Sequence, residues 1–141
     1  MSYLENLAVG NDGSGDSLIA LRWALNVAKV SHATVTVVHA TGMLERLETR
    51  FSSDVLPTEI VALAEECGFN SSALRWIVAE GDACSVLLRT CDPPINADVI
   101  VVGSRGQGKR VGLLLGSTSL EVSEHATIPV VVVPSGYKKP R

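Results

Sequence analysis

The feature that most constrains the fold is an unbroken apolar run at residues 99–102, which ends abruptly at Gly103. Further glycines follow at positions 106, 108, 112 and 116. A short run that is apolar on both faces predicts a buried strand, and closely spaced glycines predict a loop directly after it. We therefore expect a buried strand that feeds a glycine-rich loop.

A helix and another strand are expected after this loop. Thr118 and Glu121 form a T-x-x-E capping box, so we expect the helix to begin within a residue or two of Gly116. Pro129 ends the helical segment, and the four valines at Val130–Val133 predict a second buried strand. This order of strand, loop, helix and strand is typical of α/β folds.

The same order predicts an anion site at the start of the helix. A helix N-terminus carries roughly half a positive charge and several N–H groups without partners, and glycines let the backbone approach a ligand closely. Phosphate is the ligand that we expect. One helix end contributes only about 0.3–1 kcal/mol, whereas micromolar binding requires about 8 kcal/mol, so other donors must take part. The candidates are Ser104, Ser117, Thr118, Arg105, Lys109 and Arg110.

Two well-known phosphate motifs do not fit the loop. Residues 103–109 match G-x-x-x-x-G-K, but Arg110 follows where a P-loop needs Ser or Thr to hold Mg²⁺. The glycine order also lacks G-x-G-x-x-G, the dinucleotide-binding fingerprint. The pattern that does fit is G-x2-G-x9-G-(S/T), with Gly103, Gly106, Gly116 and Ser117 in register.

With this motif the chain resembles the universal stress proteins, and specifically their ATP-binding branch. Three other segments occur in the family's order, LAVGNDGSGDSLIALRWALNVA, ATVTVVHAT and PVVVVP. The resemblance covers nearly the whole chain and is weak from about Thr41 to the strand before Gly103. It implies a five-stranded parallel sheet in the order 3-2-1-4-5, with ATP bound between the first and fourth strands.

The residues by themselves predict the class of this fold. Five strands that alternate with four helices are typical of a doubly wound α/β sheet with helices on both faces. We expect strands at residues 4–9, 33–40, 73–79, 99–102 and 130–133, and helices at 18–30, 57–67, 83–90 and after Gly116. Asp16 or Ser17 would cap the first helix, Gly68 would end the second, and Asp82 would cap the third.

Two connections are less regular. Residues 52–55, SSDV, predict a loop, and the segment 41–57 is either a lid over the nucleotide or a mobile connection, of which we favour the second. Pro93 and Pro94 stop the third helix early. The family's helix normally runs on to the fourth strand, so we expect a shortened helix here and an irregular link through Asn96.

The resemblance also implies a set of residues that bind the nucleotide. Asp12, in the turn after the first strand, would bind adenine or ribose, although an Asx-turn is the alternative role for it. The backbone of Ala40 would contact adenine, and we expect its neighbour His39 to be structural. The other expected positions are Gly103, Ser104, Arg105, Gly106, Gly116, Ser117 and Thr118.

Composition excludes several classes of function. The 141 residues with 46% hydrophobic content suit one domain over residues 1–141, and a net charge of −3 argues against a nucleic-acid module. No apolar run approaches the ~18–20 residues of a membrane span, and no secretory signal is expected. Three cysteines without paired spacing favour reduced thiols in a cytoplasmic protein.

Three functions are compatible with the sequence. The leading hypothesis is a cytoplasmic regulatory protein that binds ATP, with Mg²⁺ entering on the phosphates. A slow ATPase or nucleotidyl-transferring enzyme is the second, but the loop offers only Gln107 to position water, so we expect slow or absent turnover. The third is an interaction module without a nucleotide. We also expect a homodimer, because the edge strand at Val130–Val133 needs cover; the signalling partner stays open.

Overall fold

The computed structural model describes residues 4–41, 51–53, 55–105 and 116–138. Its strands are β1 (Asn6–Gly10), β2 (Thr34–Ala40), β3 (Phe51–Ser53), β4 (Leu74–Ala79), β5 (Val99–Gly103) and β6 (Val130–Val133). Its α-helices are α1 (Gly15–Ser31), α2 (Thr58–Cys67), α3 (Ala83–Leu88) and α4 (Ser117–His125). Short 3-10 turns at Ser71–Ala73 and Arg89–Cys91 complete the regular elements of the described residues.

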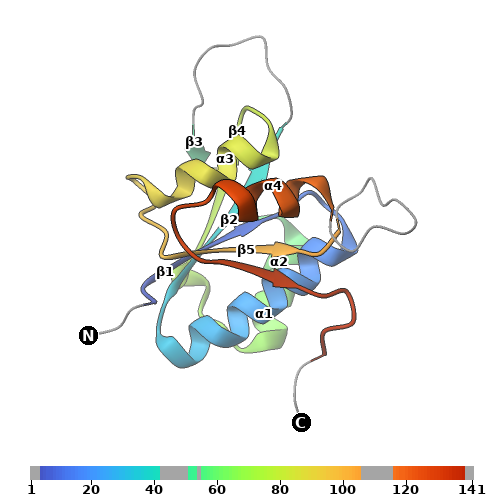
Figure 1. The fold of residues 1–141 in the computed structure, drawn as a ribbon. Coiled ribbons are helices and arrows are strands. Elements are labelled where there is room, and N and C mark those ends of the chain that lie inside the picture. The colour runs from blue at the N-terminus through green and yellow to red at the C-terminus, as the bar shows by residue number, and fades with distance from the viewer. Residues whose placement is uncertain (1–3, 42–50, 54, 106–115, 139–141) are drawn as a thin grey trace.

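Five of the strands form a parallel sheet in the order β4-β2-β1-β5-β6. Numbered by their place among the parallel strands, this is the expected order 3-2-1-4-5, so the expected α/β fold is confirmed. In Figure 1, α1 and α2 cover one face of the sheet, and α3 and α4 cover the other. The strand order reverses between β1 and β5, where doubly wound sheets place their ligands.

The central strands are buried on both faces, which explains their unbroken apolar sequence. In β5, Val99 and Val101 belong to the core beneath α1 and α2. Ile100 and Val102 belong to the core beneath α3 and α4. Because neighbouring side chains of a strand point to opposite faces, one apolar run serves both cores.

The prediction of a loop over residues 52–55 was wrong for its first half. Ser52 and Ser53 lie in β3, which pairs antiparallel with β4 at the edge of the sheet. A strand of three residues is too short to show an alternating pattern. Its formation depends on the free edge of β4, which is distant in the sequence.

The predicted caps of α1 and α4 were wrong, although both helices are present. Helix α1 begins at Gly15, and its cap is Ser14, whose Oγ accepts the N–H of Ser17. Helix α4 begins within the expected distance of Gly116, which is itself the N-cap and makes no side-chain capping bond. Thr118 is already the second helical residue, so it cannot serve as the cap of a T-x-x-E box.

The third helix behaves as expected. Asp82 caps α3, and its carboxylate accepts the N–H of Ser85 at 3.0 Å. The helix ends at Leu88, and the following link contains Asn96 at a positive φ of 51°. Ile95 and Ala97 of this link pack on the sheet against Ala8 and Ile77, so the link covers a surface that a longer helix would otherwise bury.

Candidate functional site

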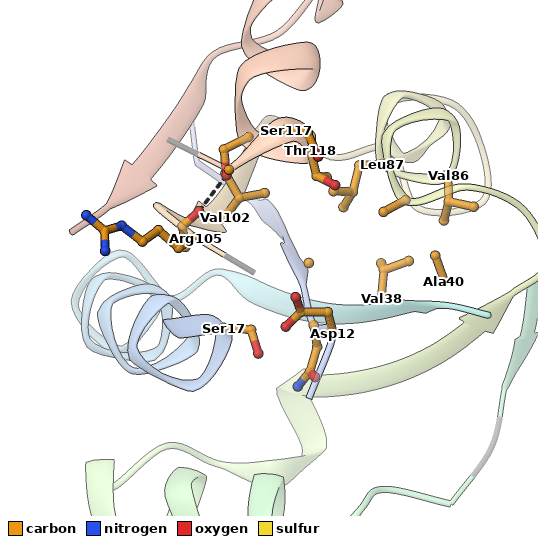
Figure 2. Close-up of a pocket in the computed structure, with 16 residues that line it drawn as sticks. Asp12, Ser17, Val38, Ala40, Val86, Leu87, Val102, Arg105, Ser117 and Thr118 are labelled. Carbon is orange, nitrogen blue, oxygen red and sulfur yellow. Dashed lines mark hydrogen bonds between the residues drawn. The ribbon is translucent and has the colours of Figure 1, made fainter. Parts of the chain in front are cut away.

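A cavity of about 290 Å³ opens at the carboxyl ends of β1, β2 and β5, beneath the start of α4. This is the point where the strand order reverses. Figure 2 shows the cavity with its lining side chains. They come from β1, α1, β2, α3, β5 and α4 and from the segments next to them: Gly10, Asn11, Asp12, Ser17, Val38, Ala40, Ala83, Val86, Leu87, Val102, Gly103, Arg105, Gly116, Ser117, Thr118 and Ser119.

One end of the cavity is apolar. Val38 and Ala40 come from β2, and Val86 and Leu87 come from α3, so the slot lies between a strand end and a short helix (Figure 2). Leu87 packs so closely on β1 that a Cβ at Gly10 would lie 3.1 Å from its Cδ1. An apolar slot of this kind suits a flat aromatic ring, which gains free energy when it leaves water.

The other end is polar and is formed by the first turn of α4. Ser117, Thr118 and Ser119 line it, and the Oγ of Ser119 donates to the carbonyl of Gly103 at 2.6 Å, which ties the helix to β5. Gly116 has no side chain with which to cap the helix, so the N-cap residue offers no side-chain acceptor to the first N–H groups of α4. This first turn of α4 is the place where the sequence predicts an anion site.

The turn after β1 carries Asp12. Its Oδ1 accepts the N–H of Ser14 at 2.9 Å, so Asp12 makes the Asx-turn that was its alternative role. The same residue also lines the cavity, and Figure 2 shows its carboxylate among the lining side chains. The two roles of Asp12 are therefore compatible.

Gly103 has a packing role that the sequence motif does not reveal. It lines the cavity, but a Cβ built on it would lie 2.7 Å from the backbone oxygen of Asp16 in α1. Such a distance is shorter than real Cβ contacts. The glycine is therefore needed for the close approach of α1 to β5, the role of the third glycine in dinucleotide-binding folds.

Ser104 and Arg105 were also predicted to bind the ligand, but their side chains are placed differently from those of the other predicted residues. Ser104 is buried and is not among the lining residues; its N–H donates to Val133 in β6, and its carbonyl accepts the N–H of Gly116. Arg105 lines the cavity, but Figure 2 shows its guanidinium extending away from Asp12. Gly106, Lys109 and Arg110 lie outside the described residues.

The structure thus gathers seven of the predicted positions around one cavity: Asp12, Ala40, Gly103, Arg105, Gly116, Ser117 and Thr118. Sequence reasoning missed the apolar lining residues Val38, Val86, Leu87 and Val102. Val102 ends an apolar run just before a motif glycine, so its position was a usable signal. Val86 and Leu87 gave none, because their place depends on how α3 packs over β2.

The ionisable groups near the cavity argue against a nucleophilic thiol. Cys84 neighbours the lining residue Ala83 and is buried; burial, with the charges of Glu121 and Asp82, raises the pKa of its thiol. A thiol with a raised pKa stays protonated and unreactive at neutral pH. Within the described residues, no group of three or more His, Cys, Asp or Glu is placed to hold a metal ion, and no helix is long and apolar enough to cross a membrane.

Comparison with known proteins gives consistent matches. The model of the universal stress protein family matches residues 4–134. A universal stress protein of Mycobacterium tuberculosis is 30% identical over 149 residues, and the match covers 94% of this chain and 98% of that protein. A universal stress protein of Mycolicibacterium smegmatis is 28% identical over 90% of this chain, which spans only 47% of that longer protein.

Solved structures match the fold over almost the whole chain. A universal stress protein in complex with cAMP has a TM-score of 0.69 at 24% identity, covering 94% of this chain and 98% of that one. The universal stress protein from Archaeoglobus fulgidus in complex with dAMP has a TM-score of 0.54 at 19% identity, covering 91% and 96%. Because both identities are below 25%, the two structures show that the fold is shared and nothing more.

Proposed function

The chain belongs to the universal stress protein family, and from this premise we propose that it is a cytoplasmic ATP-binding regulatory protein of the stress response. The observation that carries the proposal is the cavity of about 290 Å³, which joins an apolar slot to the uncapped start of α4. Its volume is near the lower end of the ~300–1,000 Å³ of small-molecule sites. The proposed nucleotide-binding domain takes in residues 1–141.

The chemistry of the two ends of the cavity indicates where each part of the nucleotide would bind. Adenine would lie in the slot between β2 and α3, beside the backbone of Ala40, where no charged side chain lines the wall. Asp12, which also lines the cavity, would accept hydrogen bonds from ribose hydroxyls or the adenine amino group. The phosphates would lie along Gly116, Ser117 and Thr118, where backbone N–H groups, hydroxyls and the helix dipole converge.

The predicted loop positions complete the phosphate site in this proposal. Gly103, Ser104 and Arg105 form the backbone that leads into the loop, and Gly106 would let it approach the phosphates. Mg²⁺ would arrive bound to the phosphates, since the described residues offer no cluster of ligands for it. Two structural neighbours carry cAMP and dAMP, and this supports an adenine nucleotide as the ligand class.

The charge at the start of α4 can be changed without harm to the helix. In Thr118→Glu a carboxylate joins the first turn of α4, where the helix dipole favours it, but it would repel the phosphates. We expect calorimetric titration to show ATP affinity lowered by about tenfold or more. Thr118→Gln is the matched control, because it has the same length without the charge, and we expect its affinity within about threefold of the wild type.

Several results would contradict the proposal. Equal ATP affinity in Thr118→Glu and the wild type would remove the phosphates from the start of α4. A wild type that binds none of ATP, ADP, AMP and cAMP would favour the interaction module without a nucleotide. Steady release of phosphate from ATP, lost in Thr118→Glu, would favour the slow ATPase.

A further inference from the structure

The turn that carries Asp12 is held from behind by the end of β2. The N–H of Asn11 donates to the carbonyl of Val38 at 2.9 Å. The carbonyl of Asn11 lies 2.8 Å from Nδ1 of His39. Since a carbonyl oxygen can only accept a hydrogen bond, Nδ1 carries the proton and donates it. Both backbone groups of Asn11 are thus bonded to β2.

The position of Asn11 determines that of the next residues. Its side-chain Oδ1 accepts the N–H of Gly13 at 2.7 Å, and Oδ1 of Asp12 accepts the N–H of Ser14 at 2.9 Å. Asn11 and Asp12 both line the cavity. A shift of the Asn11 peptide would therefore move the carboxylate of Asp12 relative to a bound ligand.

His39 lies outside the lining of the cavity. Val38 and His39 are neighbours in β2, so their side chains point to opposite faces of the sheet. Val38 lines the cavity, whereas His39 does not; its ring is stacked on Trp76, with the centroids 5.8 Å apart and the planes at 16°. This contact holds the imidazole in place on the far side of the sheet.

We infer that His39 is a positioning residue for nucleotide binding, whose Nδ1–H keeps the turn of Asn11 and Asp12 in the geometry that meets the ligand. It would touch no part of the nucleotide. The inference rests on the proposed function, because it explains what keeps the proposed nucleotide site in its geometry.

Three substitutions separate the hydrogen bond from the ring. In His39→Asn the side-chain amide can take the place of Nδ1–H, in His39→Gln it lies one bond farther out, and in His39→Leu there is no donor. All three lose the stacking on Trp76, so the comparison isolates the donor. We expect ATP affinity to fall about tenfold in His39→Leu and His39→Gln, and His39→Asn to stay within about threefold of the wild type.

Two further measurements keep the result interpretable. Thermal unfolding must show that the variants are folded at the titration temperature. Amide hydrogen exchange without nucleotide should show faster exchange at Gly13 and Ser14 in His39→Leu and His39→Gln, with protection kept in His39→Asn. A merely structural role for the ring would lower stability in all three variants alike, without this difference.

The outcomes distinguish the inference from the proposed function. If the wild type binds ATP and all three variants bind it equally well, or all three weaken equally, the inference is wrong while the proposed function stands. If the wild type binds no adenine nucleotide, the proposed function is wrong, and His39 retains at most a role in folding, which also overturns the inference.

Discussion

Gly103 lies where the last residue of β5 meets the start of α1. A methyl group there would lie 2.7 Å from a backbone oxygen of Asp16, which cannot rotate away as a side chain can. We expect Gly103→Ala to lower the free energy of unfolding by about 1–3 kcal/mol, the usual range for overpacking. Thermal and urea unfolding would measure the loss.

Gly15, the first residue of α1, is the matched control for this prediction. A Cβ built there meets nothing within 4 Å, so Gly15→Ala should be neutral or stabilising by up to about 1 kcal/mol. An unfolding midpoint of Gly103→Ala equal to that of Gly15→Ala would show that the glycine is not required for packing. Its position in the motif would then reflect the ligand alone.

At the scale of the element, α3 depends on its cap because it has only six residues yet supplies Val86 and Leu87 to the cavity. The N–H of Ser85 bonds to the carboxylate of Asp82 and lowers the pKa of that carboxyl. We expect Asp82→Ala to lose about 0.5–2 kcal/mol of stability at pH 7, the usual cost of a lost cap. Urea unfolding measured from pH 7 to pH 3 would test this.

The pH dependence follows from the sign of the shift. Because the pKa of Asp82 is lower in the folded state, its contribution is fully present above the unfolded value of about 3.9 and is lost as the pH falls through the folded value. The difference between the wild type and Asp82→Ala should therefore shrink in acid. Asp82→Asn should keep the cap at every pH, and a loss as large as that of Asp82→Ala would refute the capping role.

At the scale of the whole molecule, β6 is the open edge of the sheet. The carbonyls of Pro129 and Val133 bond to the N–H groups of Ile100 and Ser104 on the β5 side. By alternation, the backbone groups of Val130 and Val132 point outward. We propose that this edge pairs with a second copy of the chain, because the backbone groups at an open sheet edge are a template for pairing with another strand.

Val132→Pro would test the proposed homodimer, since it removes an outward N–H without removing a bond to β5. We expect sedimentation equilibrium at micromolar concentration to give a dimer for the wild type and a monomer for Val132→Pro. Val30→Lys is the control, because Val30 is 79% exposed at the end of α1. A monomeric wild type, or a dimeric Val132→Pro, would exclude pairing through β6.

Most strands and helices, and the polar end of the cavity, could be predicted from the residues. Three predicted features depend only on neighbours in the chain, and the structure contains each of them. They are the strand before Gly103, the cap of α3 at Asp82 and the end of α2 at Gly68. The register of the G-x2-G-x9-G-(S/T) motif, read with its family resemblance, marked the polar end of the cavity. These signals are local, because a strand period, a cap or a turn needs only a few consecutive residues.

The tertiary structure alone decided which distant residues meet. Val86 and Leu87 became walls of the cavity because α3 packs over β2, Gly103 is constrained by Asp16, and β3 formed because β4 had a free edge. His39 reaches Asn11 only because β1 and β2 end side by side. Contacts of this kind join residues far apart in the chain. Local sequence patterns therefore fixed most of the helices and strands and the place of the glycine motif, whereas β3, the cavity walls and the contact of His39 with Asn11 depended on packing.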